Sequence, residues 1–237
     1  MQPAARDPAP HNPGELFLDE IREQPAALRR FISRTAELEA VTHAIVQRAP
    51  TVVRLVGHGS SDAAASYGVY AFGLLPGWTA MRDSISLTVY YDSKVDLSSS
   101  VVIALSQSGE TPDVVEYVKL ARAKGALTVA ITNGADSGLA HAADATLALA
   151  AGPERAVAAS KTFLNTLAAL ALLAAGAAGR SAEITAGLTR VSEQLASSLA
   201  PLERAVQPVA AAFAYVGRMY TSAAASSSEP PGRSRSS

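Results

Sequence analysis

The stretch from Val101 to Asp113 reads V-V-I-A-L-S-Q-S-G-E-T-P-D and decides the fold. Its first five residues are all apolar, as in a strand that is buried on both faces of a sheet. A strong helix start follows, since Thr111 can cap a helix, Pro112 suits its first position and Asp113 complements its dipole. The stretch therefore predicts a buried strand, a polar turn and a helix.

Similar units recur along the chain. Further short strands are expected at Thr51 to Val56, Trp78 to Arg82, Ala126 to Ile131 and Ala145 to Leu149. Helical patterns separate them, so the strands are expected to lie parallel. The sequence thus predicts a three-layer α/β/α domain around a five-stranded parallel sheet. In such sheets ligands bind beyond the carboxyl ends of the strands.

Composition divides the chain into four parts. Residues 1–14 and 219–237 are poor in large apolar residues and are expected to be disordered. Residues 15–180 are expected to hold the α/β domain, including its lead-in helices. Residues 181–218 are expected to form linker helices, with a new strand at Phe213 to Val216.

Charge and cysteine content narrow the function. Of the 237 residues, 49% are apolar, so a sizeable core is expected. Lys and Arg number 20 and Asp and Glu 21, so no overall electrostatic field is expected to attract nucleic acid or a membrane. There is no Cys, which excludes disulfides, thiolate metal sites and a Cys nucleophile. Without an apolar run for a secretory signal before residue 14, a cytoplasmic location is expected. No metal and no cofactor are expected.

Residues 163 to 178 form the most apolar stretch, yet they fall short of the roughly 18 residues that a membrane-spanning helix needs. We interpret them as a buried helix. Its apolar surface is expected to be covered by a second domain or subunit, which predicts a homodimer.

The polar turn after the strand at 101 to 105 has more hydroxyls than a helix cap requires. Ser106, Gln107, Ser108 and Thr111 surround Gly109 at a helix N-terminus, where free N–H groups and the dipole favour an anion. A helix cap uses only one of these three hydroxyls. We therefore prefer a phosphate site to simple helix capping.

A second turn, Gly57 to Ser61, follows the strand at 51 to 56. Asp62 stands where the dinucleotide fingerprint G-x-G-x-x-G requires its third glycine, which weakens that reading. A P-loop motif and the G-x-S-x-G of a nucleophile elbow are absent from the sequence.

The turn Ser106 to Thr111 resembles the phosphate loop of the sugar isomerase (SIS) domain family, especially the isomerase half of glucosamine-6-phosphate synthases. Three further segments match in the family's order: Glu20 to Pro25, Gly57 to Ser61, and Gly152 to Thr162. The resemblance covers about residues 15 to 218. It implies a doubly wound, flavodoxin-like fold and a sugar phosphate ligand.

By position, the resemblance implies that Ser106, Ser108 and Thr111 hold the phosphate. It implies that the sugar is lined by Gln107, Ser60 and the backbone of Val157 and Ala158. Ser61 and Ser160, from the same matched motifs, are also expected to bind the substrate. Ala159 replaces a hydroxyl that the synthases carry, so this pattern is more similar to glutaminase-free deaminases and isomerases of amino sugar phosphates.

The resemblance also implies a second SIS domain, which supplies the enolising carboxylate and a lysine. Here the sequence turns into a Ser, Pro and Arg tail soon after Phe213, so we expect truncation by a frameshift or early stop. The alternative is a natural single-domain protein with a disordered tail.

Two residues are candidates for acid-base catalysis. Glu154 follows the last strand near the same crevice, but it can equally cap the next helix. His58 lies in the second turn, where a solvated loop histidine is the preferred interpretation.

Two functions therefore remain: an aldose–ketose isomerase or deaminase of an amino sugar phosphate, with fructose 6-phosphate or glucosamine 6-phosphate type substrates, and a non-catalytic sugar phosphate sensor.

Overall fold

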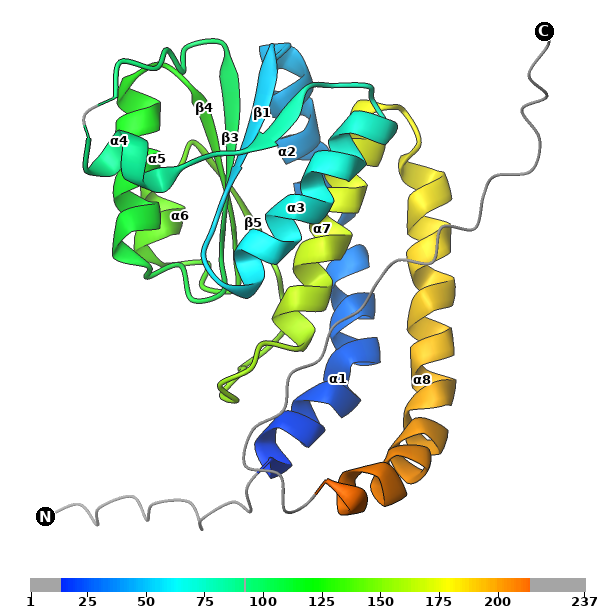
Figure 1. The fold of residues 1–237 in the computed structure, drawn as a ribbon. Coiled ribbons are helices and arrows are strands. Elements are labelled where there is room, and N and C mark those ends of the chain that lie inside the picture. The colour runs from blue at the N-terminus through cyan, green and yellow to red at the C-terminus, as the bar shows by residue number, and fades with distance from the viewer. Residues whose placement is uncertain (1–13, 92, 214–237) are drawn as a thin grey trace, which may run out of the picture. The chain divides into compact units, whose positions relative to one another are not determined.

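The computed structural model describes residues 14–91 and 93–213, and its centre is one parallel sheet with the strand order β2-β1-β3-β4-β5 (Figure 1). The strands are β1 Val52–Val56, β2 Ala80–Arg82, β3 Ser100–Ser106, β4 Leu127–Thr132 and β5 Ala145–Ala148. Every residue of β3 is buried, as expected of a central strand covered on both faces. The predicted five-stranded parallel sheet is confirmed.

Helices cover both faces of the sheet, which gives the predicted three layers (Figure 1). One layer contains α1 Glu15–Ile32, α2 Thr35–Arg48, α3 Ser60–Leu74 and α7 Lys161–Ala177. The other contains α4 Ile85–Val89, α5 Pro112–Ala123 and α6 Gly138–Ala142. Along β3, Ile103 and Leu105 pack in the first layer's core and Val102 and Ala104 in the second. The helix α4 has only five residues, too few for a readable periodicity in the sequence.

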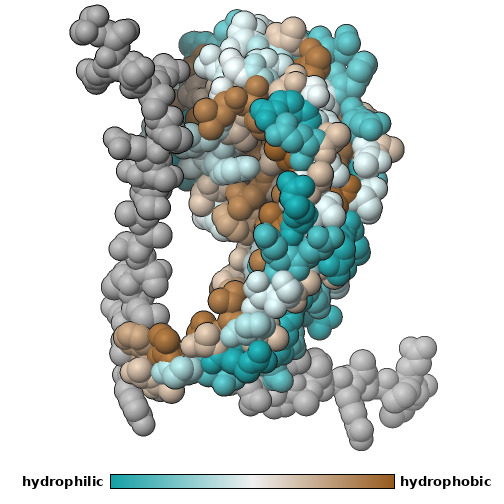
Figure 2. All heavy atoms as spheres, turned by 90° about the vertical axis from the view of Figure 1, so that its right-hand side faces the viewer, coloured by the Kyte–Doolittle hydropathy of each residue, from teal (hydrophilic) through white to brown (hydrophobic). Residues whose placement is uncertain are grey.

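The expected surface on the apolar helix is not available, because α7 is buried within the chain. Its buried residues run from Lys161 to Ala175 and include most of the Ala and Leu side chains. Small Ala side chains let α1, α2 and α3 approach it closely. The face of the molecule in Figure 2 mixes hydrophilic and hydrophobic residues. The prediction that α7 offers a surface to a second subunit is therefore wrong.

The long helix α8, Ser181–Ala212, follows α7, and the chain forms two compact units that divide at Leu199. In the first unit Ser192 is fully buried, donates to the Pro25 carbonyl oxygen at 3.1 Å and accepts from Arg29 at 3.2 Å. These bonds hold the beginning of α8 against α1. Apart from Phe213, the strand expected up to Val216 lies outside the described residues, as do the expected disordered ends.

Across residues 14–91 and 93–213, no helix is long and apolar enough to cross a lipid bilayer.

Candidate functional site

The two Gly and Ser turns lie at the carboxyl ends of β1 and β3, which are neighbours in the sheet. Chain connections leave these two strands in opposite directions, to β2 and to β4, so they flank the switch point where open α/β sheets bind ligands. Gly57 lets the turns approach. A Cβ there would lie 2.9 Å from the Leu105 carbonyl oxygen, closer than real contacts allow.

The loop that runs from Ser106 to Thr111, here the phosphate loop, is held by its own hydroxyls and by amides from outside it. Asn133 donates to the Gln107 carbonyl oxygen at 3.0 Å and Leu139 to the Gly109 carbonyl oxygen at 2.9 Å. The Ser106 hydroxyl, in a residue that is 6% exposed, accepts from the Gly109 amide at 3.1 Å and lies 3.1 Å from the Thr111 hydroxyl. The Ser108 hydroxyl accepts from the Glu110 amide at 3.2 Å. The hydroxyls thus converge at the beginning of α5.

Thr111 does not cap α5 with its side chain, contrary to the sequence expectation. It occupies the cap position in an extended conformation, and its hydroxyl makes no cap hydrogen bond. The pairing of Thr111 with Ser106 turns that hydroxyl back into the loop. The helix start therefore keeps amide groups available for an anion. Pro112 at the first position matches the prediction. Gly125, with a φ of +84°, follows the end of α5.

Glycine is required at position 109 for two reasons. Its φ of +72° lies in the left-handed region. A Cβ would also collide with the Ser137 side chain and lie 2.8 Å from the Thr132 hydroxyl. The tight return of the phosphate loop depends on this position.

A third segment, Gly152 to Ser160, follows β5 and leads into α7; it is called the sugar loop below. Glu154 in this loop caps α7. Its Oε1 accepts from the amides of Ser160 at 3.0 Å, Lys161 at 2.9 Å and Thr162 at 3.2 Å. Of the two interpretations from sequence, the geometry gives Glu154 the capping contacts, while a role as base stays a prediction.

The same carboxylate joins the sugar loop to the phosphate loop. Oε2 of Glu154 accepts from the Gln107 side-chain amide at 2.9 Å and also from the Thr162 hydroxyl. This bond brings together Gln107 and Glu154, which lie 47 positions apart in the chain. The predicted binding of one substrate by Gln107 and Ser160 requires that the two loops meet in this way.

Sequence reasoning missed the part that α1 plays. Glu20, 5% exposed, accepts from the amides of Arg155 at 2.5 Å and Ala156 at 3.2 Å. The Lys161 ammonium, in a residue 1% exposed, lies 2.5 Å from the Glu23 carboxylate. The matching segment from Glu20 to Pro25 was the available signal, but nothing in the sequence says which loop these carboxylates meet.

His58 contacts the beginning of α5. Its Nε2 lies 2.9 Å from the Asp113 carboxylate, and its side chain is half exposed. A hollow of about 340 Å³ beside this pair is lined by Gly57, His58, Asp62, Asp83, Ser84, Ile85, Ser86, Tyr90 and Asp113. His58 therefore lies at the crevice but is engaged by a carboxylate, and its catalytic role stays a prediction.

Asp83, on the wall of that hollow, belongs to a buried polar cluster. It accepts from Arg54 at 2.8 Å and from the Tyr117 hydroxyl at 2.7 Å. Burial raises the pKa of Tyr117, and the hydrogen bond to Asp83 raises it further. Tyr117 therefore stays a neutral donor at any ordinary pH, and the cluster fixes the chain after β2.

The remaining predicted residues lie at the same edge of the sheet. Ser60 and Ser61 are the first residues of α3, where their N-terminal position suits an anion. Val157 and Ala158 form the tip of the sugar loop, and the Val157 side chain is fully exposed. The structure thus gathers the substrate-binding candidates around the carboxyl ends of β1, β3 and β5.

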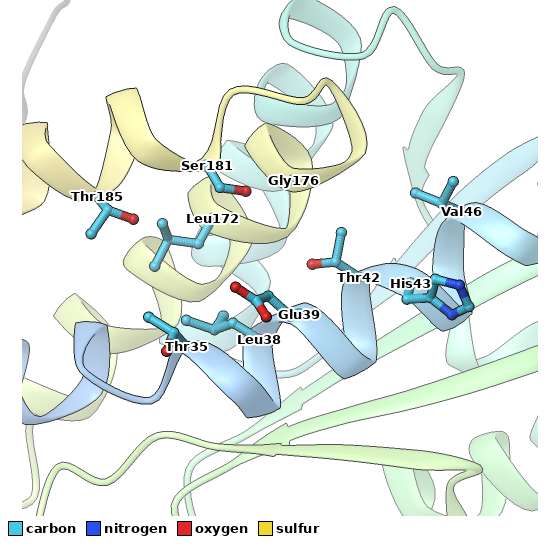
Figure 3. Close-up of a pocket in the computed structure, with 10 residues that line it drawn as sticks. All are labelled: Thr35, Leu38, Glu39, Thr42, His43, Val46, Leu172, Gly176, Ser181 and Thr185. Atoms are coloured by element: carbon cyan, nitrogen blue, oxygen red, sulfur yellow. The ribbon is translucent and has the colours of Figure 1, made fainter.

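A second hollow, of about 310 Å³, lies away from this edge between α2, α7 and the beginning of α8 (Figure 3). It is lined by Thr35, Leu38, Glu39, Thr42, His43, Val46, Leu172, Gly176, Ser181 and Thr185. None of the site residues predicted from sequence lines it.

Comparison with known proteins identifies this arrangement. Residues 50–176 match the family model of the SIS domain. The chain belongs to the SIS domain family. The match begins just before β1 and ends in α7, so it contains the sheet, the phosphate loop and the sugar loop of this SIS domain.

Individual relatives agree. The glutamine–fructose-6-phosphate aminotransferase (isomerizing) of Aeropyrum pernix is 40% identical over 176 residues, which are 73% of this chain and 28% of that protein. A solved structure from Silicibacter pomeroyi DSS-3, assigned as a phosphosugar isomerase, is 35% identical with a TM-score of 0.73, covering 77% of this chain and 56% of that one.

The sugar isomerase domain of an RpiR transcription factor from Sphaerobacter thermophilus shares the fold. Its TM-score is 0.52 at 23% identity, with 77% of this chain and 98% of that chain covered. This SIS chain therefore spans little more than a quarter of its curated relative and about half of the phosphosugar isomerase.

Proposed function

We propose that this SIS domain binds a phosphorylated hexose or amino sugar, as the first SIS domain of an aldose–ketose isomerase or deaminase. Fructose 6-phosphate and glucosamine 6-phosphate represent the substrate class. The observation that carries the proposal is the phosphate loop, in which the Thr111 hydroxyl is directed to Ser106 instead of capping α5. Several hydroxyls at a helix N-terminus suit a phosphate better than they suit any structural need.

Calorimetry with fructose 6-phosphate and fructose tests the proposal. The phosphorylated sugar is expected to bind and the free sugar is not. Ser108→Ala is expected to weaken only the former, by about 1–3 kcal/mol, since it removes a hydrogen bond to a charged group. Ser197→Ala, on exposed α8, is the matched control and should change nothing. Equal affinities for the two sugars would remove the phosphate-loop assignment.

Turnover by this chain alone is expected to be poor. Moving a proton between C1 and C2 of the opened sugar needs a positioned base and an acid, which contribute roughly 10²–10⁴-fold. The candidate base Glu154 already accepts from several backbone amides and from Gln107. Robust isomerisation of fructose 6-phosphate, abolished by Glu154→Gln, would show instead that one SIS domain holds a complete site.

A non-catalytic sensor is the second candidate, favoured by the fold shared with the sugar isomerase domain of a transcription factor. A binding assay beside a turnover assay separates the sensor from the isomerase or deaminase. Binding of sugar phosphate without turnover supports the sensor, provided that adding a second SIS domain protein does not restore turnover. The homodimer and the cytoplasmic location stay predictions from the sequence.

A further inference from the structure

The shape of the sugar loop depends on hydrogen bonds to side chains. Between Ala151 and Ser160 the backbone forms neither helix nor strand, and the Val157 side chain at its tip is fully exposed. A loop of this kind is held in place by whatever satisfies its backbone groups. Asn133 satisfies the Ala151 amide and the Gly152 carbonyl oxygen. Glu154 satisfies the Ser160 amide.

Side chains of α1 make further contacts. At its start, the Arg30 guanidinium donates to the carbonyl oxygens of Ala150 at 3.3 Å and Ala151 at 3.0 Å. In its middle, the Glu20 carboxylate accepts from the amides of Arg155 and Ala156. Just after the loop, the Glu23 carboxylate pairs with the ammonium of Lys161, the first residue of α7.

Glu20 is the contact nearest to the tip. Its two amide partners directly precede Val157 and Ala158, the residues whose backbone is proposed to line the sugar. A carboxylate that is 5% exposed requires hydrogen bonds, and charge-assisted bonds to two consecutive amides fix the direction of the peptide planes that follow.

We infer that Glu20 is a positioning residue for sugar recognition, which sets the Val157 and Ala158 backbone from α1. This rests on the proposed function. Phosphate recognition is separate, because the phosphate loop is held by its own hydroxyls and by amides such as those of Asn133 and Leu139. Loss of Glu20 therefore removes what the sugar contributes to the binding affinity and leaves what the phosphate contributes.

The test compares inorganic phosphate with fructose 6-phosphate by calorimetry, on the full chain and its variants. We expect the unchanged chain to bind fructose 6-phosphate at least about tenfold more tightly than phosphate, because hydrogen bonds to the sugar hydroxyls add to those of the phosphate. This ratio of affinities is called the margin below. Glu20→Ala should reduce this margin to about twofold at unchanged phosphate affinity. Glu20→Gln, which keeps one acceptor oxygen, should lie between them.

Asp19→Ala is the matched control, because Asp19 is the neighbouring acid on α1 but is exposed and pairs with Arg22. It should leave the margin unchanged. Hydrogen exchange without ligand is the second measurement, and the amides of Arg155 and Ala156 should exchange faster in Glu20→Gln. This readout supports the inference even if Glu20→Ala does not fold.

The outcomes separate the two proposals. If the unchanged chain binds no sugar phosphate, the proposed function fails and the role in sugar recognition fails with it. The inference about Glu20 is overturned, while the proposed function stands, in either of two cases. In the first, the chain binds sugar phosphate and both Glu20→Gln and Glu20→Ala retain its margin. In the second, the amides of Arg155 and Ala156 exchange in Glu20→Gln at the rate of the unchanged chain.

Discussion

The phosphate loop and the sugar loop lie at the same edge of the sheet but are built in different ways. The hydroxyls of the phosphate loop bond within it: Ser106 to the Gly109 amide and to Thr111, and Ser108 to the Glu110 amide. The amides of Asn133 and Leu139, from outside the loop, bond to its backbone carbonyl oxygens. The sugar loop depends on Glu20, 135 positions earlier in the chain. The hydroxyl pattern of the phosphate loop is therefore encoded in its own sequence, whereas the sugar loop can be changed from another helix.

Gly109→Ala is the strongest way to break the local loop. The left-handed φ costs about 1–2 kcal/mol for a residue with a Cβ, and the clash with Ser137 adds about 1–3 kcal/mol. We expect a stability loss of about 2–5 kcal/mol in urea denaturation and loss of sugar phosphate binding.

Gly73→Ala is the control for this change. Gly73 lies in α3, and a Cβ there has nothing within 4 Å. It should stabilise the chain by about 0.5–1 kcal/mol, because alanine is the better helix former. If Gly109→Ala changed neither stability nor sugar phosphate binding, the phosphate loop would not depend on this glycine.

Removing Glu23 tests the remote support at the end of the sugar loop. Glu23→Gln leaves the Lys161 ammonium buried without that carboxylate, and we expect a loss of about 2 kcal/mol, below the usual range for buried pairs because Glu23 is half exposed. Lys161→Met should recover most of this loss in the double variant, since an apolar side chain needs no partner. Urea denaturation of both single variants and the double variant measures the coupling, and additive losses would contradict it.

Thr111→Val sharpens the distinction between capping and ligand binding. Because the Thr111 hydroxyl makes no cap hydrogen bond and only its contact with Ser106 is lost, stability should fall by no more than about 1 kcal/mol, while fructose 6-phosphate affinity falls about tenfold. Ser137→Ala, which removes a hydroxyl that does cap α6, should lower stability by a similar amount, about 0.5–1 kcal/mol. A large stability loss in Thr111→Val would restore the capping role.

The stability of the fold in acid should depend on Asp144, which lies just before β5, at the opposite end of the strands from both loops. Burial alone would raise the pKa of Asp144, but hydrogen bonds from Thr128 and the Arg122 guanidinium outweigh it and lower the pKa. A carboxyl with a lowered folded pKa stabilises the fold above its unfolded pKa of about 3.9, and this contribution is lost as pH falls through the folded pKa.

Asp144→Asn should therefore be less stable at neutral pH and lose less additional stability below about pH 4 than the unchanged chain. Urea denaturation at both pH values measures this small effect. The ratio of fructose 6-phosphate to phosphate affinity at neutral pH should not change, and a changed ratio would link the two ends of the strands.

The fold was largely readable from the sequence because its signals are local. The buried run at β3, the Pro112 start of α5 and the Gly125 end each follow from a few neighbouring residues. The errors arose where neighbours compete. Thr111 is a good cap by type, but Ser106 takes its hydroxyl. The burial of α7 was expected, but α1, α2 and α3 cover it in place of a second domain or subunit.

By itself the sequence determined the sheet, the two Gly and Ser turns at its carboxyl edge, and a phosphate loop whose hydroxyls and glycine are adjacent in the chain. Only the tertiary structure decided how Glu20, Glu23, Gln107 and Glu154 meet around the sugar loop. The physical reason is that a carboxylate binds whichever amides the packing of α1 and α7 brings within about 3 Å, and no local pattern records that distance.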